Sequence, residues 1–407
     1  MTMADSPFDD AFAGLGGASA QRRAAYDRFR SLGLPSRRQE DWKYTDLAGL
    51  DRARLAPAAT GPAVSAPVAG LDGPLLVLTN GRVDADASRM GDLPAGLEIV
   101  TDGEPASTGA DNALAALNAA FAPQAVHVRV ADGAAIDRPL QLLYRVTDAD
   151  ACAAHVRVRV ALGARAALTL VERFEGDASA YWQNQVLDVA GETGSTLIHA
   201  LFQAEGPRSV HSGLTRVALA GGARYRRFDL QTGAEIARNE VHVAATEAGA
   251  HADIRVAQMA RAGQSLDTRS YLDHRVADTT SDQGARAVVD AQGRTAFQGK
   301  VHVARDAQRT DAQQQSKAIL LDETAEANTK PELEIYADDV VCAHGATVGQ
   351  LDAAALFYLV QRGLPLAEAK ALLIEAFVAD LFGDLDDDTL RDAFVAAAQV
   401  WFGKEPS

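Results

Sequence analysis

The chain has 407 residues, of which 47% are hydrophobic and 23% charged, and these are the proportions of a folded protein. Lys and Arg number 39 against 55 Asp and Glu, so the formal net charge of −16 repels nucleic-acid phosphates and anionic membranes and argues against nucleic-acid binding. Two cysteines, Cys152 and Cys342, are too few for a disulfide framework and indicate a reducing compartment.

The ends of the chain and its apolar runs contain no obvious targeting or membrane signal. Residues 1–17 are acidic and have no basic segment leading into an apolar one, so we expect no secretory signal. The best apolar run, Ala353–Gln361, stops at Arg362, well short of the ~18 residues that a membrane span needs. We therefore expect a cytoplasmic protein that does not cross a membrane.

The first zone, residues 1–73, is predicted to be helical and to end in a linker. Apolar residues of Ala20–Leu32 lie on one side of a helix with charged residues mostly elsewhere, and a glycine and a proline follow. Residues 34–47 are dense in charge and aromatic side chains. The segment Ala56–Gly73, rich in Ala, Pro and Gly, is predicted to be the linker.

The second zone, residues 74–350, is predicted to consist of one strand after another. Apolar and polar residues alternate in Val126–Val130 and in His155–Val160, and a Val-His-Val triplet recurs at 126–128, 241–243 and 301–303. Glycines interrupt the pattern at intervals of 31, 28 and 27 residues, at Gly163, Gly194, Gly222 and Gly249.

A repeat of this size without intervening helical patterns indicates the stacked coils of a β-solenoid. Two packed sheets also give short strands with regular turns, but a sandwich of about 260 residues is large for one domain. The pattern therefore favours the solenoid and leaves the sandwich as the alternative.

The third zone, residues 351–407, returns to helix. An apolar cluster at 356–360 ends at Gly363, and Pro365 opens a helix over Leu366–Phe382. Three aspartates at 386–388 precede a last helix that runs through Trp401, where acidic side chains meet the positive end of the helix dipole.

Motifs for nucleotide binding and nucleophilic catalysis are not found. Gly293–Val301 resembles a phosphate loop, but it has five residues between its glycines where four are needed. Val301 also lacks the hydroxyl that would hold Mg²⁺, so we interpret the segment as a turn into a strand. No Gly-x-Ser-x-Gly elbow occurs. We expect a chain that binds no nucleotide and is not an enzyme.

The nine histidines are scattered, and most alternate with valines, so we expect those to face outward from their strands. His344 differs because Cys342 precedes it by two residues. On a strand both side chains point to one face, and thiol and imidazole suit Fe or Zn. Two ligands do not complete a site, so the pair is interpreted either as part of a metal site or as a half-buried structural pair.

Several segments of the sequence resemble a known family. Lys330–Gly349 is similar to the carboxy-terminal signature of the SufB/SufD iron–sulfur cluster assembly family, and Leu356–Leu364 also fits. Glu40–Thr45 is similar to the amino-terminal motif, so the resemblance covers the chain from end to end. Gly345 follows His344 where SufB usually carries a glutamate, and this favours the SufD branch.

The resemblance implies a right-handed parallel β-helix core flanked by N-terminal and C-terminal helical regions. It also implies a non-enzymatic scaffold that pairs with a SufB-like paralogue and supports iron entry. A transient iron–sulfur cluster or iron would be shared with a partner chain, with His344 and Cys342 as the candidate ligands at the partner interface. The C-terminal helices are expected to dock a SufC-like ATPase through Tyr358, Arg362, Leu366, Leu373 and Phe377.

Two other functions are weighed against this one. A metal-binding homodimer acting without SufB would use the same interface. A polysaccharide-active β-helix enzyme would need clustered carboxylates or basic residues on one solenoid face, but the acidic residues here are spread singly through the β zone.

Overall fold

The computed structural model of the protein describes most of the chain, and it leaves out the first seven residues and most of the expected linker Ala56–Gly73. The described ranges are 8–47, 56–57, 71–103, 112–147 and 152–403.

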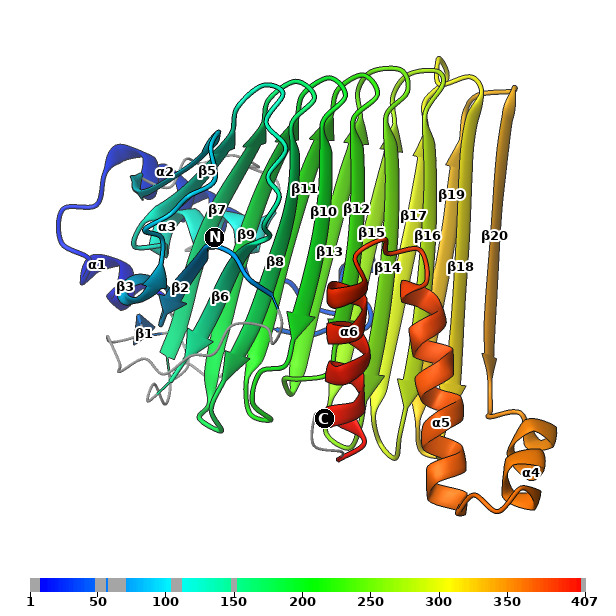
Figure 1. The fold of residues 1–407 in the computed structure, drawn as a ribbon. Coiled ribbons are helices and arrows are strands. Elements are labelled where there is room, and N and C mark those ends of the chain that lie inside the picture. Colours follow the sequence, from blue (N-terminus) through cyan, green and yellow to red (C-terminus); the bar gives the residue numbers. More distant parts are fainter. Residues whose placement is uncertain (1–7, 48–55, 58–70, 104–111, 148–151, 404–407) are drawn as a thin grey trace.

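The body of the molecule is a β-solenoid in which successive strands alternate between two sheets, here called sheet A and sheet B (Figure 1). Sheet A runs β4 (Leu97–Gly103), β5 (Ala125–Val130), β7 (Cys152–Leu162), β9 (Tyr181–Gly191), β11 (Val210–Leu219), β13 (Ile236–Ala245), β15 (Ser265–His274), β17 (Arg294–Val303), β19 (Glu326–Ile335), and β1 (Ala56–Pro57) pairs with β7. Sheet B runs β3 (Arg82–Arg89), β2 (Leu75–Thr79), β6 (Leu140–Val146), β8 (Ala167–Gly176), β10 (Thr196–Gln203), β12 (Arg224–Gln231), β14 (His251–Ala260), β16 (Thr280–Val289), β18 (Thr310–Leu320), β20 (Val340–Gly349).

The glycine repeat marks the turns between coils, so the predicted solenoid is confirmed over the sandwich. Gly194, Gly222 and Gly249 have φ values of 70°, 67° and 78°, in the left-handed region that glycine enters at little cost. The turns also stack, because the amide of Gly194 donates to the carbonyl of Gly221 at 2.9 Å and the amide of Gly222 to that of Ala248 at 3.0 Å. One coil thus sets the position of the next.

The main core lies between the two sheets and is built from the inward positions of the alternating strands. In all three Val-His-Val triplets both valines are buried in this core. The central histidines of the triplets, His127, His242 and His302, are half-buried and face outward as expected.

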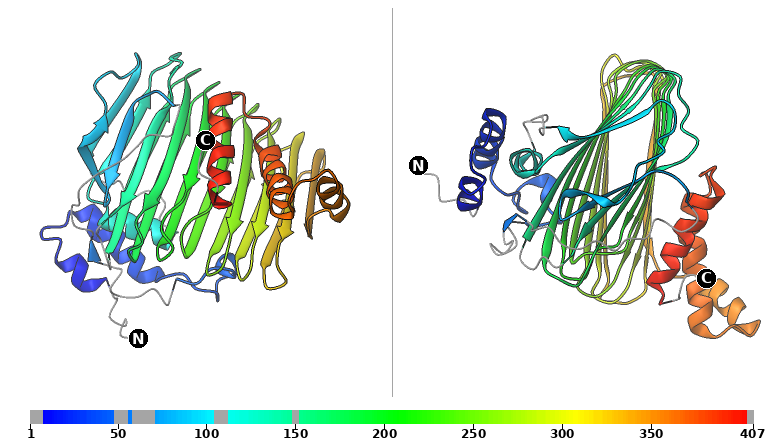
Figure 2. Two further views of the ribbon diagram at one scale, coloured as in Figure 1. Left: turned by 60° about the horizontal axis from the view of Figure 1, so that its bottom comes forward. Right: turned by 60° about the vertical axis from the view of Figure 1, so that its left-hand side comes forward.

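Helices cover one end of sheet A on its outer face (Figure 2). The predicted first helix is confirmed as α2 (Ala20–Leu32), whose first turn is capped by the Ser19 hydroxyl and which ends at Gly33 with φ 71°. A short helix, α1 (Asp9–Ala13), precedes it, and the 3₁₀ turn η1 (Glu40–Trp42) follows.

Helix α3 (Ala113–Phe121) lies inside the zone predicted to be strands alone, so that prediction is wrong there. Its sequence is alanine-rich and favours helix. Every residue from Leu114 to Phe121 is buried, against α2 on one side and sheet A on the other.

The C-terminal helices lie on the outer face of sheet B. The predicted helices are confirmed as α4 (Ala353–Gln361), α5 (Leu366–Ala379) continuing into η3 (Asp380–Phe382), and α6 (Asp388–Trp401). Phe394 stacks on Phe202 of sheet B and on Phe382, with ring centroids 4.3 Å apart in both pairs. Helix α4 extends away from this layer (Figures 1 and 2). None of the described helices is both long and apolar enough to cross a membrane.

Four of the nine histidines are buried, although one of them, His155, faces outward from its strand as expected. His199 and His211 lie inside the solenoid in hydrogen bonds to Glu172 and Glu205. The other two, His155 and His274, are also buried. Burial lowers the pKa of His155 to about 3 and that of His274 to about 4, so both imidazoles are neutral in the folded protein.

These two histidines should make the fold acid-sensitive. The unfolded chain takes up a proton at each imidazole below pH ~6.5, whereas the folded protein does not until near pH 3–4. The free energy of unfolding should therefore fall by roughly 3 kcal/mol between pH 6.5 and 5, measured by denaturant titration. In the variant His274→Gln the free energy of unfolding should fall by only about half as much over this pH range.

A control for general loss of packing is Gln258→Met, which changes a buried side chain that does not titrate. It should shift the unfolding free energy by the same amount at both pH values. If the unfolding free energy of His274→Gln depended on pH as strongly as that of the wild type, buried His274 would not be a source of the acid sensitivity.

Candidate functional site

The solenoid is open at its carboxy-terminal end. Strands β19 and β20 are the last of their sheets, and each pairs with a single neighbour among the described strands. No further coil covers their inward faces, so Ile335 and Val348 are 36% and 46% exposed although their strand neighbours are buried or half-buried. On the outward faces Tyr336 and Val341 are also exposed. The inward faces and free edges of β19 and β20 are called the open end below.

Both residues of the expected Cys–His pair lie at the open end, on β20. Cys342 is half-buried and contacts the main core. His344 is exposed, and because it follows by two residues on the same strand it shares the inward face. The two residues of the pair therefore differ in exposure, with Cys342 half-buried and His344 open to solvent.

The thiol of Cys342 is held in its protonated form. Burial raises its pKa, the nearby carboxylate of Asp311 adds to this, and a backbone hydrogen bond from Ala312 opposes it. A metal ion at this position would therefore have to displace the proton. Among the described residues no three His, Cys, Asp or Glu side chains lie together as a metal site.

The residues expected to dock an ATPase divide into two groups. Tyr358 and Leu366 are 57% and 55% exposed, and the exposed guanidinium of Arg362 lies 5.1 Å from the Tyr358 ring. Leu373 and Phe377 are half-buried. Phe377 packs against the cluster between the C-terminal helices and sheet B, and the guanidinium of Arg286 covers its ring.

Helix α4 also exposes a side chain that the sequence analysis did not assign to the interface. Phe357 is 66% exposed, and none of the residues of α4 is buried. The sequence of α4 already indicated this surface, because a helix that is apolar on all sides is expected to be buried, and one that its own chain does not bury is expected to bind a partner.

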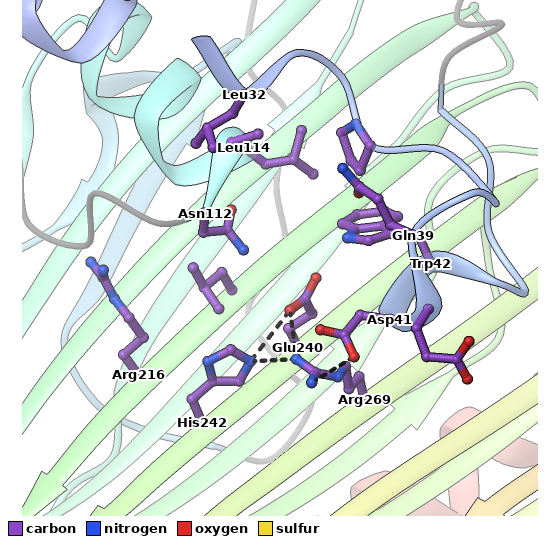
Figure 3. Close-up of a pocket in the computed structure, with 14 residues that line it drawn as sticks. Leu32, Gln39, Asp41, Trp42, Asn112, Leu114, Arg216, Glu240, His242 and Arg269 are labelled. Carbon is purple, nitrogen blue, oxygen red and sulfur yellow. Dashed lines mark hydrogen bonds and ion pairs between the residues drawn. The ribbon is translucent and has the colours of Figure 1, made fainter. Parts of the chain in front are cut away.

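A cavity of about 550 Å³ lies between η1, the start of α3 and the outer face of sheet A (Figure 3). Two ion pairs lie in its wall: Arg269 lies 2.9 Å from Asp41, and His242 lies 3.3 Å from Glu240. Its other charged groups, Glu40 and Arg216, pair with residues outside the cavity. The cavity wall therefore consists largely of contacts that hold the amino-terminal segment against the sheet.

The same segment is clamped along several coils of sheet A. The guanidinium of Arg238 lies 4.5 Å from the centre of the Trp42 ring and donates to the carbonyl of Asp41 at 2.7 Å. The hydroxyl of Thr45 donates to buried Asp267, and Lys330 on β19 pairs with Glu40. The sequence analysis used Glu40–Thr45 only for the resemblance and missed this structural role.

The glycine pair that resembled a phosphate loop is part of the solenoid, as expected. Gly293 lies in a turn and Gly299 lies within β17. The ammonium group of Lys300 pairs with Glu334 on the neighbouring strand at 2.8 Å.

Comparison with known proteins identifies the family that this chain matches. Residues 144–377 match the model of the SufBD core domain of the SUF system for FeS cluster assembly. The chain is 30% identical to the iron–sulfur cluster assembly protein SufD of Escherichia coli over 93% of this chain and 92% of that protein. It is 28% identical to an iron–sulfur cluster assembly SufBD family protein of Synechocystis, over 90% and 87% of the two chains. It is 31% identical to the chloroplast protein ABCI7 of Arabidopsis thaliana, over 68% of this chain and 60% of that one.

Proposed function

The chain belongs to the SufBD family of iron–sulfur cluster assembly proteins, and from this premise we propose that it is the SufD-type scaffold subunit of a larger assembly complex. In this proposal it performs no catalysis of its own. It pairs with a SufB-like paralogue, supports the entry of iron, and docks a SufC-like ATPase. Cys152 and Cys342 form no disulfide with each other, which fits the reducing cytoplasmic compartment that we propose for the protein.

The observation that carries the proposal is the open end. A strand edge with unpaired backbone groups is a template for pairing with another chain, and proteins normally cover such edges. Here β19 and β20 carry exposed apolar side chains instead, among them Ile335, Tyr336, Val341 and Val348. A paralogous solenoid seated on these strands would bury them.

The cargo of this interface is a nascent iron–sulfur cluster or iron ion. His344 offers an exposed imidazole, and Cys342 lies two residues away on the same face. Both are ordinary ligands of iron. Two donors from one chain leave coordination positions for sulfide and for donors of the partner, so the cluster would be held between two subunits and released by their movement.

Helix α4 and the start of α5 are the proposed docking surface for the ATPase. Their exposed apolar residues lie apart from the α5–α6 layer that covers sheet B, so a partner can bind here without disturbing the solenoid. Tyr358 and Arg362 are of the residue types that most often dominate binding energy at interfaces.

The two alternative functions, a polysaccharide-active β-helix enzyme and a metal-binding homodimer, are distinguished by different observations. Carboxylates on the outer faces are paired with basic residues, as in Asp188 with Arg216 and Asp253 with Arg226, and this disfavours a glycosidase-like pair flanking a groove. A homodimer would cover the same open end. Copurification of a SufB-like chain with the tagged protein favours the heterocomplex, and a second copy alone favours the homodimer.

The variant His344→Ala tests the ligand role. The side chain is exposed, so the melting temperature should stay within a few degrees of wild type. Maturation of an iron–sulfur enzyme in cells that carry only the variant should fall sharply. The control His251→Ala removes a half-exposed imidazole from β14, away from the open end, and should mature clusters normally. Normal maturation in His344→Ala would remove this residue from the site.

The double variant Tyr358→Ala/Leu366→Ala tests the docking surface. Each truncation at an interface centre costs ~2 kcal/mol or more, so affinity for the ATPase subunit should fall by at least tenfold in a titration. The control Val400→Ala changes a 53%-exposed residue of α6 and should bind normally. Unchanged affinity of the double variant would contradict docking at α4.

A further inference from the structure

One column of side chains runs along the inward face of sheet B and ends at the site. Its members occupy the same register position on successive parallel strands, which are spaced ~4.8 Å apart, so their side chains stack on one another. In order from the middle of the solenoid to the open end they are His199, Arg227, Ile254, Gln283, Gln314 and His344.

The two members before His344 are buried glutamines with unused hydrogen-bonding atoms. Gln314 is 4% exposed, and neither its Nε2 nor its Oε1 has a hydrogen-bond partner. Gln283 is fully buried; its Oε1 accepts from the Ser270 hydroxyl, but its Nε2 has no partner. Buried amides without partners are rare in folded proteins because they give up their bonds to water, so a group at this place is expected to satisfy Gln314.

The absence of a side chain at Gly299 on the opposite sheet leaves room for the Gln314 amide. Gly299 on β17 faces it, and a methyl group at Gly299 would overlap the amide nitrogen of Gln314. On the next coil Pro331 follows Gly299 in register, just as His344 follows Gln314. The amide thus lies between the sheets against Gly299, on the strand next to the one that carries His344.

We propose that Gln314 is a positioning residue for His344, and this inference rests on the proposed function of that histidine. The amide has no bond to His344 in the structure. In the proposed contact the exposed ring of His344 turns so that one ring nitrogen bonds the amide from the buried side and the other nitrogen is left for iron. Oε1 can accept from a ring N–H, or Nε2 can donate to an unprotonated ring nitrogen. Either bond selects one tautomer and one ring orientation, which is what partners behind metal-binding histidines ordinarily do.

The contact can be measured on the full chain without any metal. The ¹⁵N chemical shifts of histidine rings report the tautomer ratio, and the His344 signal is assigned by its loss in His344→Ala. In Gln314→Met, which keeps the length of the side chain and removes the amide, the excess of one tautomer should fall severalfold. The control Gln313→Met changes the neighbouring residue on β18, which faces outward and bonds to Asp311, and should leave the ratio unchanged.

The functional consequence is measured in cells that carry only the variant chain. Loss of a partner behind a metal-binding histidine typically costs 10- to 100-fold in metal affinity or activity. Cluster maturation with Gln314→Met should therefore fall by about tenfold, and with Gln313→Met it should stay at the wild-type level. A merely structural role for Gln314 would lower the melting temperature without changing the tautomer ratio.

A second variant protects the test against a folding failure. Gly299→Ala keeps the amide but displaces it, because the new methyl group takes its place, and it should shift the tautomer ratio in the same direction. An unchanged ratio in both Gln314→Met and Gly299→Ala would overturn the inference, and water would then be the partner of the amide. If the ratio shifts but His344→Ala matures clusters normally, the positioning contact stands and the proposed function of His344 fails instead.

Discussion

The hydrogen-bonded stacking of one coil on the next is the constraint on which the rest of the structure depends. From β6 to β18 each strand has a parallel neighbour on both sides, so a coil at the end of the stack leaves strand edges and an interior face uncovered unless another element closes it. The chain treats its ends differently. At the amino-terminal end the antiparallel strands β3 and β4 close the sheets, whereas at the carboxy-terminal end β19 and β20 are left open. The site follows from this asymmetry, because the open coil carries His344 and Cys342.

The outer faces of the solenoid explain why few other surfaces remain free. The amino-terminal segment is clamped along sheet A through Trp42, Arg238 and Asp267, and the α5–α6 layer covers part of sheet B. Both elements bury apolar side chains of their own against the sheets. Most of the exposed large hydrophobic side chains among the described residues lie on or beside β19 and β20, on α4, or at the start of α5, and the two proposed partner surfaces coincide with these places. Leu372 and Val400 are the others. The proposed cargo site and the proposed ATPase surface are therefore two separate places on one fold.

The sequence predicted the repeat, α2, the C-terminal helices and the Cys–His pair, because each of these features depends on a local pattern of residues. It failed where burial depends on distant segments. His155 faces outward from its strand as predicted, but Phe121 and Trp182 lie 5.5 and 5.7 Å from its ring and bury it. His199 faces inward and is satisfied by Glu172 at 2.8 Å and Tyr225 at 2.9 Å, partners 27 and 26 residues away. Leu373 and Phe377 are half-buried, and a helical stripe alone does not reveal which of its residues the solenoid covers.

The most direct test of the central claim is pulsed EPR on the reduced cluster of the assembled complex, with ¹⁵N-labelled histidine in this chain alone. If the cluster is held at the open end, its spectrum should contain a ¹⁵N hyperfine coupling from a bound imidazole, and that coupling should be absent when the labelled chain carries His344→Ala. A cluster that shows no ¹⁵N coupling in the wild-type complex, or the same coupling in both, would contradict the placement of the cargo on His344.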